Sequence, residues 1–425
     1  MYKIRLATSI GAAFTFADTA QAQTASINSG DTAWVLAATC LVLLMTIPGL
    51  ALFYGGLVRK KNVLSTLMQS FAACCLVSIL WVIAGYSFAF SGQGAWLGDT
   101  KQIFLSALTK DAVTGTIPES LFMVFQMSFA IITPAIICGA FADRMKFSAL
   151  LWFLGAWLML AYVPVAHWVW GGGFLAKMGF LDFAGGTVVE INSGMAGLVA
   201  ALMLGKRQGF PQEAMIPHNL ILSVTGASLL WVGWLGFNGG SALAANATAA
   251  MALANTQIAG AAAALAWMAI EWVRHKKPSV LGIISGAVAG LVAITPACAY
   301  VSPIGAAAIG ALAGLFCFYG ATSLKRKFGY DDSLDVFGVH GIGGFVGIIG
   351  IGIFGSQTWG GTTGLLQGSS AQLIIQIQGA LIVAAWCAVV SFAILWVIKK
   401  TIGLRVSRED EVNGLDLSLH GEVVP

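Results

Sequence analysis

Two ionisable side chains lie within long apolar stretches of the sequence, where a charge is costly. Glu190 is the only residue that normally carries a charge between Gly185 and Gly205, and His340 lies in a second apolar run. A carboxylate at the centre of a membrane helix costs roughly 2.5–3.5 kcal/mol, so it normally faces the protein interior and has a partner. A carboxylate and an imidazole in contact titrate as a coupled unit. The two residues are a candidate proton-handling pair; a purely structural ion pair between helices is the alternative.

Aromatic residues and one hydroxyl gather near the ends of other apolar stretches. Phe125 and Phe129 are four residues apart in "VFQMSFA" and share a helix face. Trp170 ends a second stretch, and Phe237 and Ser241 end a third. Ring faces attract an ammonium-like cation, by about 2 kcal/mol when it is desolvated, and a serine oxygen can accept its hydrogen bond. The pattern favours a cation site, although aromatic residues also gather at membrane interfaces for structural reasons.

Asp182 lies just before the apolar stretch that contains Glu190. It could cap the N-terminus of that helix through backbone N–H groups. Alternatively, its negative charge could help to hold a cation above a pore.

Sequence patterns typical of enzymes are missing from the chain. It has no Gly-rich nucleotide loop, no nucleophile elbow and no HExxH pattern. The seven cysteines lie in apolar stretches and show no metal-ligand spacing. We therefore expect a protein that is not an enzyme, has no metal centre, no cofactor and binds no nucleic acid.

The composition is that of a polytopic membrane protein. Of the 425 residues, 58% are hydrophobic and only 9% are charged, whereas a soluble domain is closer to a quarter charged. Apolar stretches of 18 or more residues predict transmembrane helices. The fold class is therefore all-α, and we expect eleven spans: 32–58, 63–90, 119–142, 147–170, 185–205, 217–241, 250–273, 278–299, 303–324, 335–355 and a long final span at 371–398.

Basic residues follow the odd-numbered spans. Seventeen of the 22 Lys and Arg residues lie in these clusters, from Arg59 to Arg408, and the opposite loops carry only Lys101, Lys110 and Lys177. The positive-inside rule then places the mature N-terminus outside and the C-terminus in the cytoplasm.

We expect the chain to be divided into three parts. Residues 1–22 have a basic start, an apolar middle and the ending Ala20-Gln21-Ala22, which predicts a signal peptide cleaved after Ala22. An uncleaved N-terminus is the alternative. Residues 23–403 form one membrane domain, and residues 404–425 form a short cytoplasmic tail.

A weak internal repeat relates the two halves of the membrane domain. When Glu190 is aligned with His340, Gly194 meets Gly344 and Gly197 meets Gly347. Spans one to five would then repeat as six to ten. Because five is odd, the second copy must be inverted, which is typical of transporters with a site between the two halves.

Several long stretches together resemble the ammonium transporter family (Amt/Mep/Rh) in its bacterial Amt form. They are "TIPGLALFYGGLVRKKNVLS", "VAHWVWGGGFLAKMGFLDFAGGTVVEINSG", "WLGFNGGS", "ITPACAYV" and "DVFGVHGIGG". The resemblance covers nearly the whole chain after residue 22. It implies a homotrimer of eleven-helix subunits in a plasma membrane, here a bacterial inner membrane, with one pore in each subunit.

The resemblance also assigns roles to residues. It implies an outer ammonium site of Phe125, Phe129, Trp170 and Ser241, and a gate formed by the stacked rings of Phe129 and Phe237. Asp182, Trp234 and Thr295 would support the site and the pore.

One position departs from the family pattern. Most members carry two histidines in the pore; His340 matches the second, whereas Glu190 occupies the position of the first. The chain would therefore carry a Glu–His variant of the twin-histidine pair. The tail "GLRVSREDEVNGLDLSLHGE" resembles a regulatory segment, which implies a PII-type partner at the cytoplasmic face.

The implied function is ammonium transport, with methylammonium as an analogue. NH4+ would dock at the outer site and lose its proton to the pair, and NH3 would cross the pore while the proton crosses separately, so that charge moves. An ammonium sensor that signals through its tail, or a passive channel for NH3 or CO2, are the alternatives. We also expect the protein to contact membrane lipid.

Overall fold

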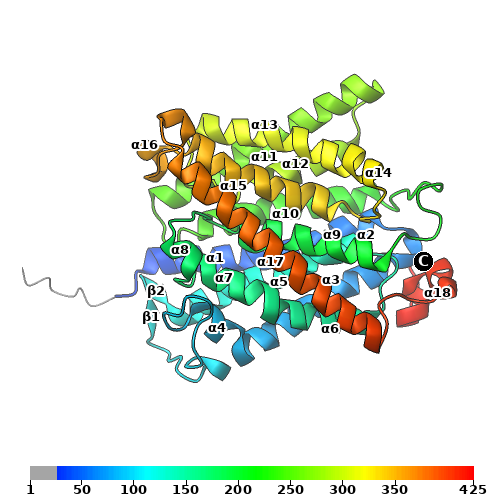
Figure 1. The fold of residues 1–425 in the computed structure, drawn as a ribbon, viewed down its shortest axis with the longest axis horizontal. Coiled ribbons are helices and arrows are strands. Elements are labelled where there is room, and N and C mark those ends of the chain that lie inside the picture. The colour runs from blue at the N-terminus through cyan, green and yellow to red at the C-terminus, as the bar shows by residue number, and fades with distance from the viewer. Residues whose placement is uncertain (1–25) are drawn as a thin grey trace, which may run out of the picture.

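The structure is a computed structural model, and it describes residues 26–425 as a bundle of helices with one small hairpin (Figure 1). The predicted signal peptide, residues 1–22, lies outside the described residues. In the described part, ten helices are long and apolar enough to cross a membrane. They match ten of the eleven predicted spans. The other predicted span, 278–299, contains the shorter apolar helix α12 (Val280–Ile294). The protein is therefore an all-helical, multi-pass membrane protein.

Most helices of the first half are built from shorter pieces. The elements in chain order are α1 (Ser29–Leu44), η1 (Met45–Leu50), α2 (Ala51–Leu57), η2 (Lys60–Asn62), α3 (Val63–Leu80), η3 (Trp81–Gly85), α4 (Tyr86–Phe90), η4 (Ile103–Leu105), β1 (Val113–Thr114), β2 (Ile117–Pro118), α5 (Glu119–Phe141), α6 (Phe147–Trp157), η5 (Leu158–Tyr162), α7 (Val163–Val169), α8 (Phe174–Lys177), η6 (Gly186–Ile191) and α9 (Asn192–Leu204). The strands β1 and β2 pair antiparallel, with Val113 opposite Pro118.

The second half is also helical and ends in a folded tail. Its elements are α10 (Leu220–Gly240), α11 (Ala247–His275), α12, α13 (Pro303–Tyr319), η7 (Gly320–Leu324), α14 (Lys325–Phe328), η8 (Phe337–Gly341), α15 (Ile342–Phe354), α16 (Gln357–Gly360), η9 (Leu365–Gln367), α17 (Ala371–Thr401), α18 (Arg408–Asn413) and η10 (Asp416–His420). Side chains of Asn246, Ser279 and Ser302 cap α11, α12 and α13 by accepting backbone N–H bonds, which satisfies donors that a helix start leaves open.

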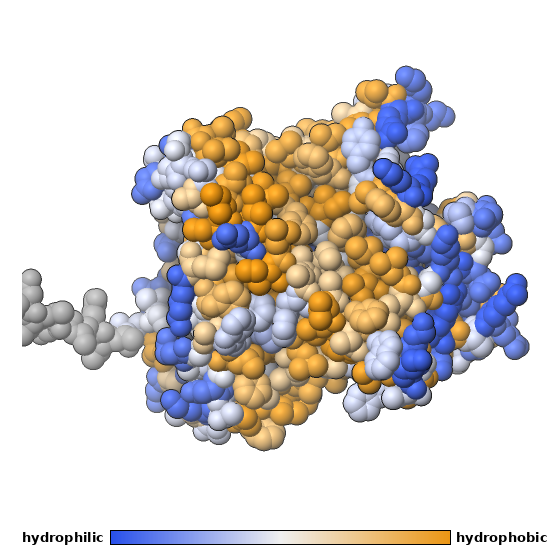
Figure 2. Space-filling model, viewed as in Figure 1, coloured by the Kyte–Doolittle hydropathy of each residue, from blue (hydrophilic) through white to orange (hydrophobic). Residues whose placement is uncertain are grey.

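A hydrophobic band surrounds the bundle. Figure 2 shows orange surface across the middle of the molecule and blue, hydrophilic surface at its two ends. Large apolar side chains such as Trp152, Ile221 and Ile304 are more than two thirds exposed. A monomeric soluble protein rarely exposes so much contiguous apolar surface. The band suits the hydrocarbon core of a bilayer, and the final helix α17 crosses it obliquely (Figure 1).

The helices that carry Glu190 and His340 begin with matching wide, π-helical turns, η6 and η8. A Cβ atom added to Gly194 would lie 2.3 Å from the Cα atom of Gly341, and one added to Gly344 would lie 3.0 Å from the backbone nitrogen of Ile191. Under the predicted alignment of the repeats, Gly194 corresponds to Gly344 and Ile191 corresponds to Gly341, so the two contacts are equivalent. Small residues let helices approach closely, so these glycines bring the two polar side chains together.

The C-terminal tail packs against the end of the bundle. Arg405 donates to the Glu411 carboxylate at 2.7 Å, and the other Glu411 oxygen accepts the backbone N–H of Gln208 at 2.7 Å. Asp416 accepts the N–H groups of Leu64 and Ser65 at the start of α3. The tail is thus a folded segment fixed to the loop that contains Gln208 and to the start of α3.

The close approach at Gly194 gives a first prediction. Gly194→Ala should destabilise the protein by roughly 1–3 kcal/mol, because the new methyl group meets backbone atoms that cannot rotate away. Thermal unfolding of the purified protein in detergent measures the effect. Gly155→Ala is the control, since its methyl group would meet a flexible leucine end at 3.3 Å. Equal melting temperatures for both variants would show that the contact at Gly194 is not tight.

Candidate functional site

Asp182 fixes the start of the helix that carries Glu190. One carboxylate oxygen accepts the N–H groups of Gly185 and Gly186 at 2.8 and 2.6 Å. The other accepts the backbone N–H and the hydroxyl of Thr187 at 2.7 and 2.6 Å. Gly185 adopts a φ of 120°, which favours glycine. These contacts match the predicted capping role and hold η6 in place.

Asp332 occupies the equivalent position before His340. Each aspartate precedes its polar pore residue by eight positions, and Asp332 accepts the N–H of Phe337 at 2.8 Å. Its second oxygen is buried and has no hydrogen-bond partner in the described part of the chain. The two caps therefore hold the two broken helices in similar ways, but only the Asp182 carboxylate is fully hydrogen-bonded.

Glu190 and His340 meet in the centre of the protein, as predicted. The Nδ1 atom of His340 and the Oε2 atom of Glu190 lie 2.6 Å apart, in a short hydrogen bond. Glu190 is completely buried, and its Oε1 atom has no hydrogen-bond partner within residues 26–425. His340 is 5% exposed and lines cavities, whereas Glu190 lines none of the three cavities described below. Glu190 thus stands behind His340 and fixes the orientation of its ring.

A cavity of about 290 Å³, called the outer cavity after the side on which the sequence predicts it, is lined by aromatic rings and by Ser241. Phe129 and Trp170 line it, with ring centres 5.9 Å apart. The Ser241 hydroxyl donates to the Phe237 carbonyl at 2.8 Å, which leaves its oxygen lone pairs free to accept from a ligand. Phe125 packs behind Phe129 at 4.9 Å and is not among the lining residues.

Phe129, which lines the outer cavity, stacks on a second ring, that of Phe237. The rings of Phe129 and Phe237 lie 4.2 Å apart at 33°. Behind them, Trp234 donates to the Thr295 hydroxyl at 2.7 Å. Trp234 also lies 5.7 Å from Phe237, so the Trp234–Thr295 contact supports one ring of the stack.

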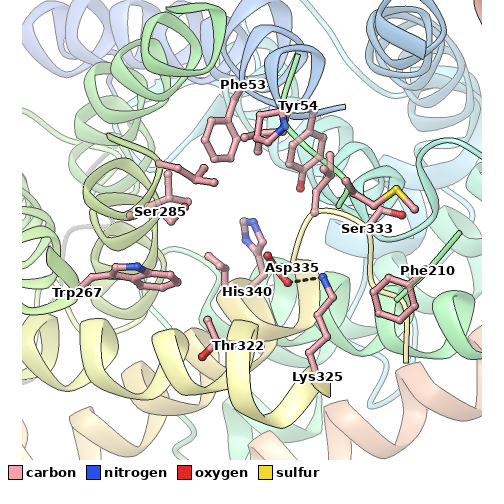
Figure 3. Close-up of a pocket in the computed structure, with 18 of the residues that line it drawn as sticks. Phe53, Tyr54, Phe210, Trp267, Ser285, Thr322, Lys325, Ser333, Asp335 and His340 are labelled. Atoms are coloured by element: carbon pink, nitrogen blue, oxygen red, sulfur yellow. Dashed lines mark hydrogen bonds and ion pairs between the residues drawn. The ribbon is translucent and has the colours of Figure 1, made fainter. Parts of the chain in front are cut away.

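A much smaller cavity is lined in part by Trp234, which packs against Phe237. This cavity of about 10 Å³ is lined by Trp234, Ile132 and His340, among others, and this volume is roughly the least that holds one water molecule. An inner cavity of about 360 Å³ follows, and His340 lines it too. Figure 3 shows the His340 ring directed into this cavity, opposite Phe53 and near the ion pair of Lys325 and Asp335. His340 therefore separates the constriction from the inner cavity.

Buried charges lie beside the lining residues Arg207 and Ser333 of the inner cavity, a region called the inner mouth below. Arg207 binds Asp331 through two side-chain hydrogen bonds of 2.9 and 2.8 Å. Burial opposes ionisation of Asp331, but the hydrogen bonds and charge of Arg207 lower its pKa below the usual range. Burial raises the pKa of Asp332 to about 6, despite the nearby charge of Lys325. Neighbouring aspartates thus have opposite pKa shifts.

Comparisons with known proteins identify the family. The sequence profile described as Ammonium Transporter Family matches residues 33–424. An ammonium transporter of Aquifex aeolicus is 50% identical over 412 residues, which cover 96% of this chain and 96% of that protein. One from Bacillus subtilis is 49% identical and covers 93% and 98%. The chain belongs to the ammonium transporter family. It is therefore an ammonium transporter and not an enzyme.

Solved structures agree with this membership. The crystal structure of Candida albicans Mep2 has a TM-score of 0.85 and 34% identity, and the match covers 91% of this transporter and 88% of that chain. A structure described as a sensor Amt protein has a TM-score of 0.86 and 29% identity, and covers 92% and 98%. The resemblance read from the sequence motifs is confirmed.

Sequence reasoning missed most of the inner cavity of the transporter. Phe53, Tyr54, Trp267 and Lys325 line it, yet they come from helices far apart in the chain. It also missed Phe122, Gln126 and Phe183 in the outer cavity. The spacing of Phe122, Gln126 and Phe129 on α5 is the one signal that could have indicated a shared helix face.

The two aspartates at the inner mouth give a paired prediction. Ionised Asp332 costs about 3 kcal/mol above pH 6, because its pKa lies about two units above the usual 3.8. Asp332→Asn should therefore raise the melting temperature at pH 7, and the gain should shrink as the pH falls from 6 to 4. Melting curves of the purified transporter across this range measure the change.

Asp331→Asn is the matched control of opposite sign. Its lowered pKa means that the ionised form stabilises the fold at neutral pH, and that this stability is lost only in acid. The variant should melt below the wild type at pH 7. If both variants shift the melting temperature in the same direction at pH 7, the electrostatic description of the inner mouth is wrong.

Proposed function

We propose that the transporter recruits NH4+ at the outer cavity, removes its proton at the Glu190–His340 pair and conducts NH3 through the constriction. The single observation that carries this proposal is the 2.6 Å contact of the pair at the narrowest part of the path. A proton acceptor at that point lies between an outer and an inner cavity. The proton crosses separately along the pair, so that transport moves charge.

Recruitment rests on ring faces and one hydroxyl. Phe129 and Trp170 offer their π systems to a cation, and Ser241 accepts one of its hydrogen bonds. Phe125 contributes by holding Phe129 in place, since it packs against that ring at 4.9 Å. Phe129 and Phe237 must then separate for the solute to pass. Asp182 supports the site through its cap and through the Trp170 indole, which donates to the Asp182 carbonyl at 2.9 Å.

The Glu190–His340 pair takes up one proton from each NH4+ and later releases it. When Glu190 is ionised, Nδ1–H of His340 donates to it, and the free Nε2 atom can accept a proton from NH4+. The products are neutral NH3 and a protonated pair, in which the added proton is shared between the His340 ring and the Glu190 carboxylate. Release of that proton towards the inner cavity resets the pair. Potassium cannot lose a proton, so a path that requires deprotonation rejects it.

The architecture completes the proposal. We infer that α12 and the turn after it, up to residue 299, form the predicted span at 278–299 and bring the number of spans to eleven, and that residues 23–403 contain an inverted five-helix repeat. The reciprocal glycine contacts support this symmetry.

Basic clusters favour an N-out and C-in orientation in a bacterial inner membrane. The chain would function as a homotrimer, with residues 404–425 as a cytoplasmic segment that a PII-type protein could recognise.

Two other functions remain distinct hypotheses. A sensor would signal through the tail, which the Glu411 and Asp416 contacts fix to the bundle. A passive channel would pass NH3 or CO2 without moving charge. The buried acid–base pair favours proton-coupled transport over both, because neither a sensor nor a passive channel needs a proton acceptor in the path.

Ammonium-evoked current in liposomes that contain the purified transporter tests the proposal. The current should rise with ammonium or methylammonium and be absent with potassium. Partner binding that depends on ammonium without any flux would favour the sensor, and uptake without current would favour the passive channel. The lack of both current and uptake over a broad concentration range would contradict ammonium transport through this pore.

Replacement of the carboxylate gives a further prediction. Glu190→His should retain transport but change its pH dependence or its ammonium-to-potassium selectivity, because an imidazole takes up a proton in a different pH range. Glu409→Gln, which neutralises a carboxylate in the tail, is the control and should behave like the wild type. Identical current–pH curves and ion ratios for Glu190→His and wild type would refute a titrating role for Glu190.

A further inference from the structure

A fourth cavity lies on the outside of the bundle, away from the three cavities described above. A groove of about 570 Å³ runs between α6 with η5 and the C-terminal part of α17. Trp152, Ala156 and Leu160 form one wall at helical spacing, and Val397, Thr401 and Ile402 belong to the other. The groove lies in the hydrophobic band, next to the hydrophilic end at which α18 lies (Figures 1 and 2).

The groove has the chemistry of a site for a hydrocarbon chain. Its side chains are apolar except for Thr401, whose hydroxyl already donates to the Val397 carbonyl at 3.0 Å. Trp152 is 68% exposed and Leu160 is 53% exposed. Apart from the Thr401 hydroxyl and the indole N–H of Trp152, the groove therefore offers mainly apolar side-chain contacts to a ligand.

The length of the groove matches one leaflet of a bilayer. Trp152 and Leu160 are eight residues apart, which is about 12 Å along a helix. Half of the hydrocarbon core is about 15 Å thick. A transmembrane helix from a second copy of the chain would need a surface about twice as long. One acyl chain of the leaflet on the tail side fits the groove.

Lysines stand at the end of the groove where a lipid phosphate would lie. The Lys146 ammonium group is 2.9 Å from the carbonyl oxygen of Ile402, which lines the groove. Lys400 follows Val397 by three residues and Ala393 by seven, so it shares a helix flank with two lining residues. Among the described residues, neither lysine forms an ion pair with a carboxylate. Their charge is available to an anion.

We propose that this groove binds an anionic glycerophospholipid, with one acyl chain between α6 and α17 and its phosphate on Lys146 and Lys400. The site adjoins the link between the membrane domain and the tail. Lys146 donates its N–H to the Leu404 carbonyl at 2.9 Å, and Val406 donates to the Arg144 carbonyl at 3.1 Å. Bound lipid would stabilise this connection between the membrane domain and the tail. The proposal does not depend on the transport mechanism.

Native mass spectrometry of the purified transporter with added phosphatidylglycerol or phosphatidylcholine tests the site. Phosphatidylglycerol should bind more tightly than phosphatidylcholine. The double variant Lys146→Gln/Lys400→Gln should weaken phosphatidylglycerol binding at one site per chain by roughly 30-fold, because each lysine near an anionic surface contributes a factor of about five. Lys276→Gln/Lys277→Gln, which removes the same charge elsewhere at the helix ends, should leave this site unchanged.

A second variant tests the groove without altering charge. Ala156→Phe should fill the groove and remove the same lipid while both lysines remain. Phosphatidylglycerol with brominated chains should quench the fluorescence of Trp152, which is the part of the fluorescence signal that Trp152→Phe loses. This quenching should be weaker in Ala156→Phe than in the wild type. Equal lipid binding by wild type and both variants would overturn the proposal. So would a change in subunit number with lipid binding unaltered, since the groove would then be an interface between copies.

Discussion

The hydrogen bond between Glu190 and His340 is the interaction on which the rest of the structure depends. A buried carboxylate is tolerated only with a partner, and the partner comes from a helix 150 residues away in the chain. Glycines at 194, 341 and 344 let those two helices approach, and Asp182 and Asp332 hold their broken starts. The fold can thus be understood as a scaffold that brings one acid and one base together across two halves.

The small cavity beside His340 suits the chemistry of the pair. The constriction beside His340 holds about one water-sized molecule, with cavities of about 290 and 360 Å³ on either side. Few waters can then compete for the proton or screen the pair. A short hydrogen bond in a dry site responds strongly to the arrival of a cation, which is what a selective proton acceptor requires.

The sequence predicted the parts of the site that local patterns encode. The repeat paired Glu190 with His340, and the position of Asp182 before an apolar run predicted its cap. It could not predict that His340 alone of the pair lines the cavities, or that Phe125 packs behind Phe129. Those facts depend on how helices far apart in the chain rotate against each other. The inner cavity, with Phe53, Trp267 and Lys325 from separate helices, was hidden for the same reason.

The central claim is that Glu190 and His340 share and exchange the proton of the transported ion. Infrared difference spectra of the reconstituted transporter, taken with and without ammonium, test it most directly. The account predicts a carboxyl band that changes when ammonium is added, shifts in heavy water and is missing in Glu190→Gln. A spectrum in which no carboxyl band responds to ammonium, or in which the responding band persists in Glu190→Gln, would contradict the account.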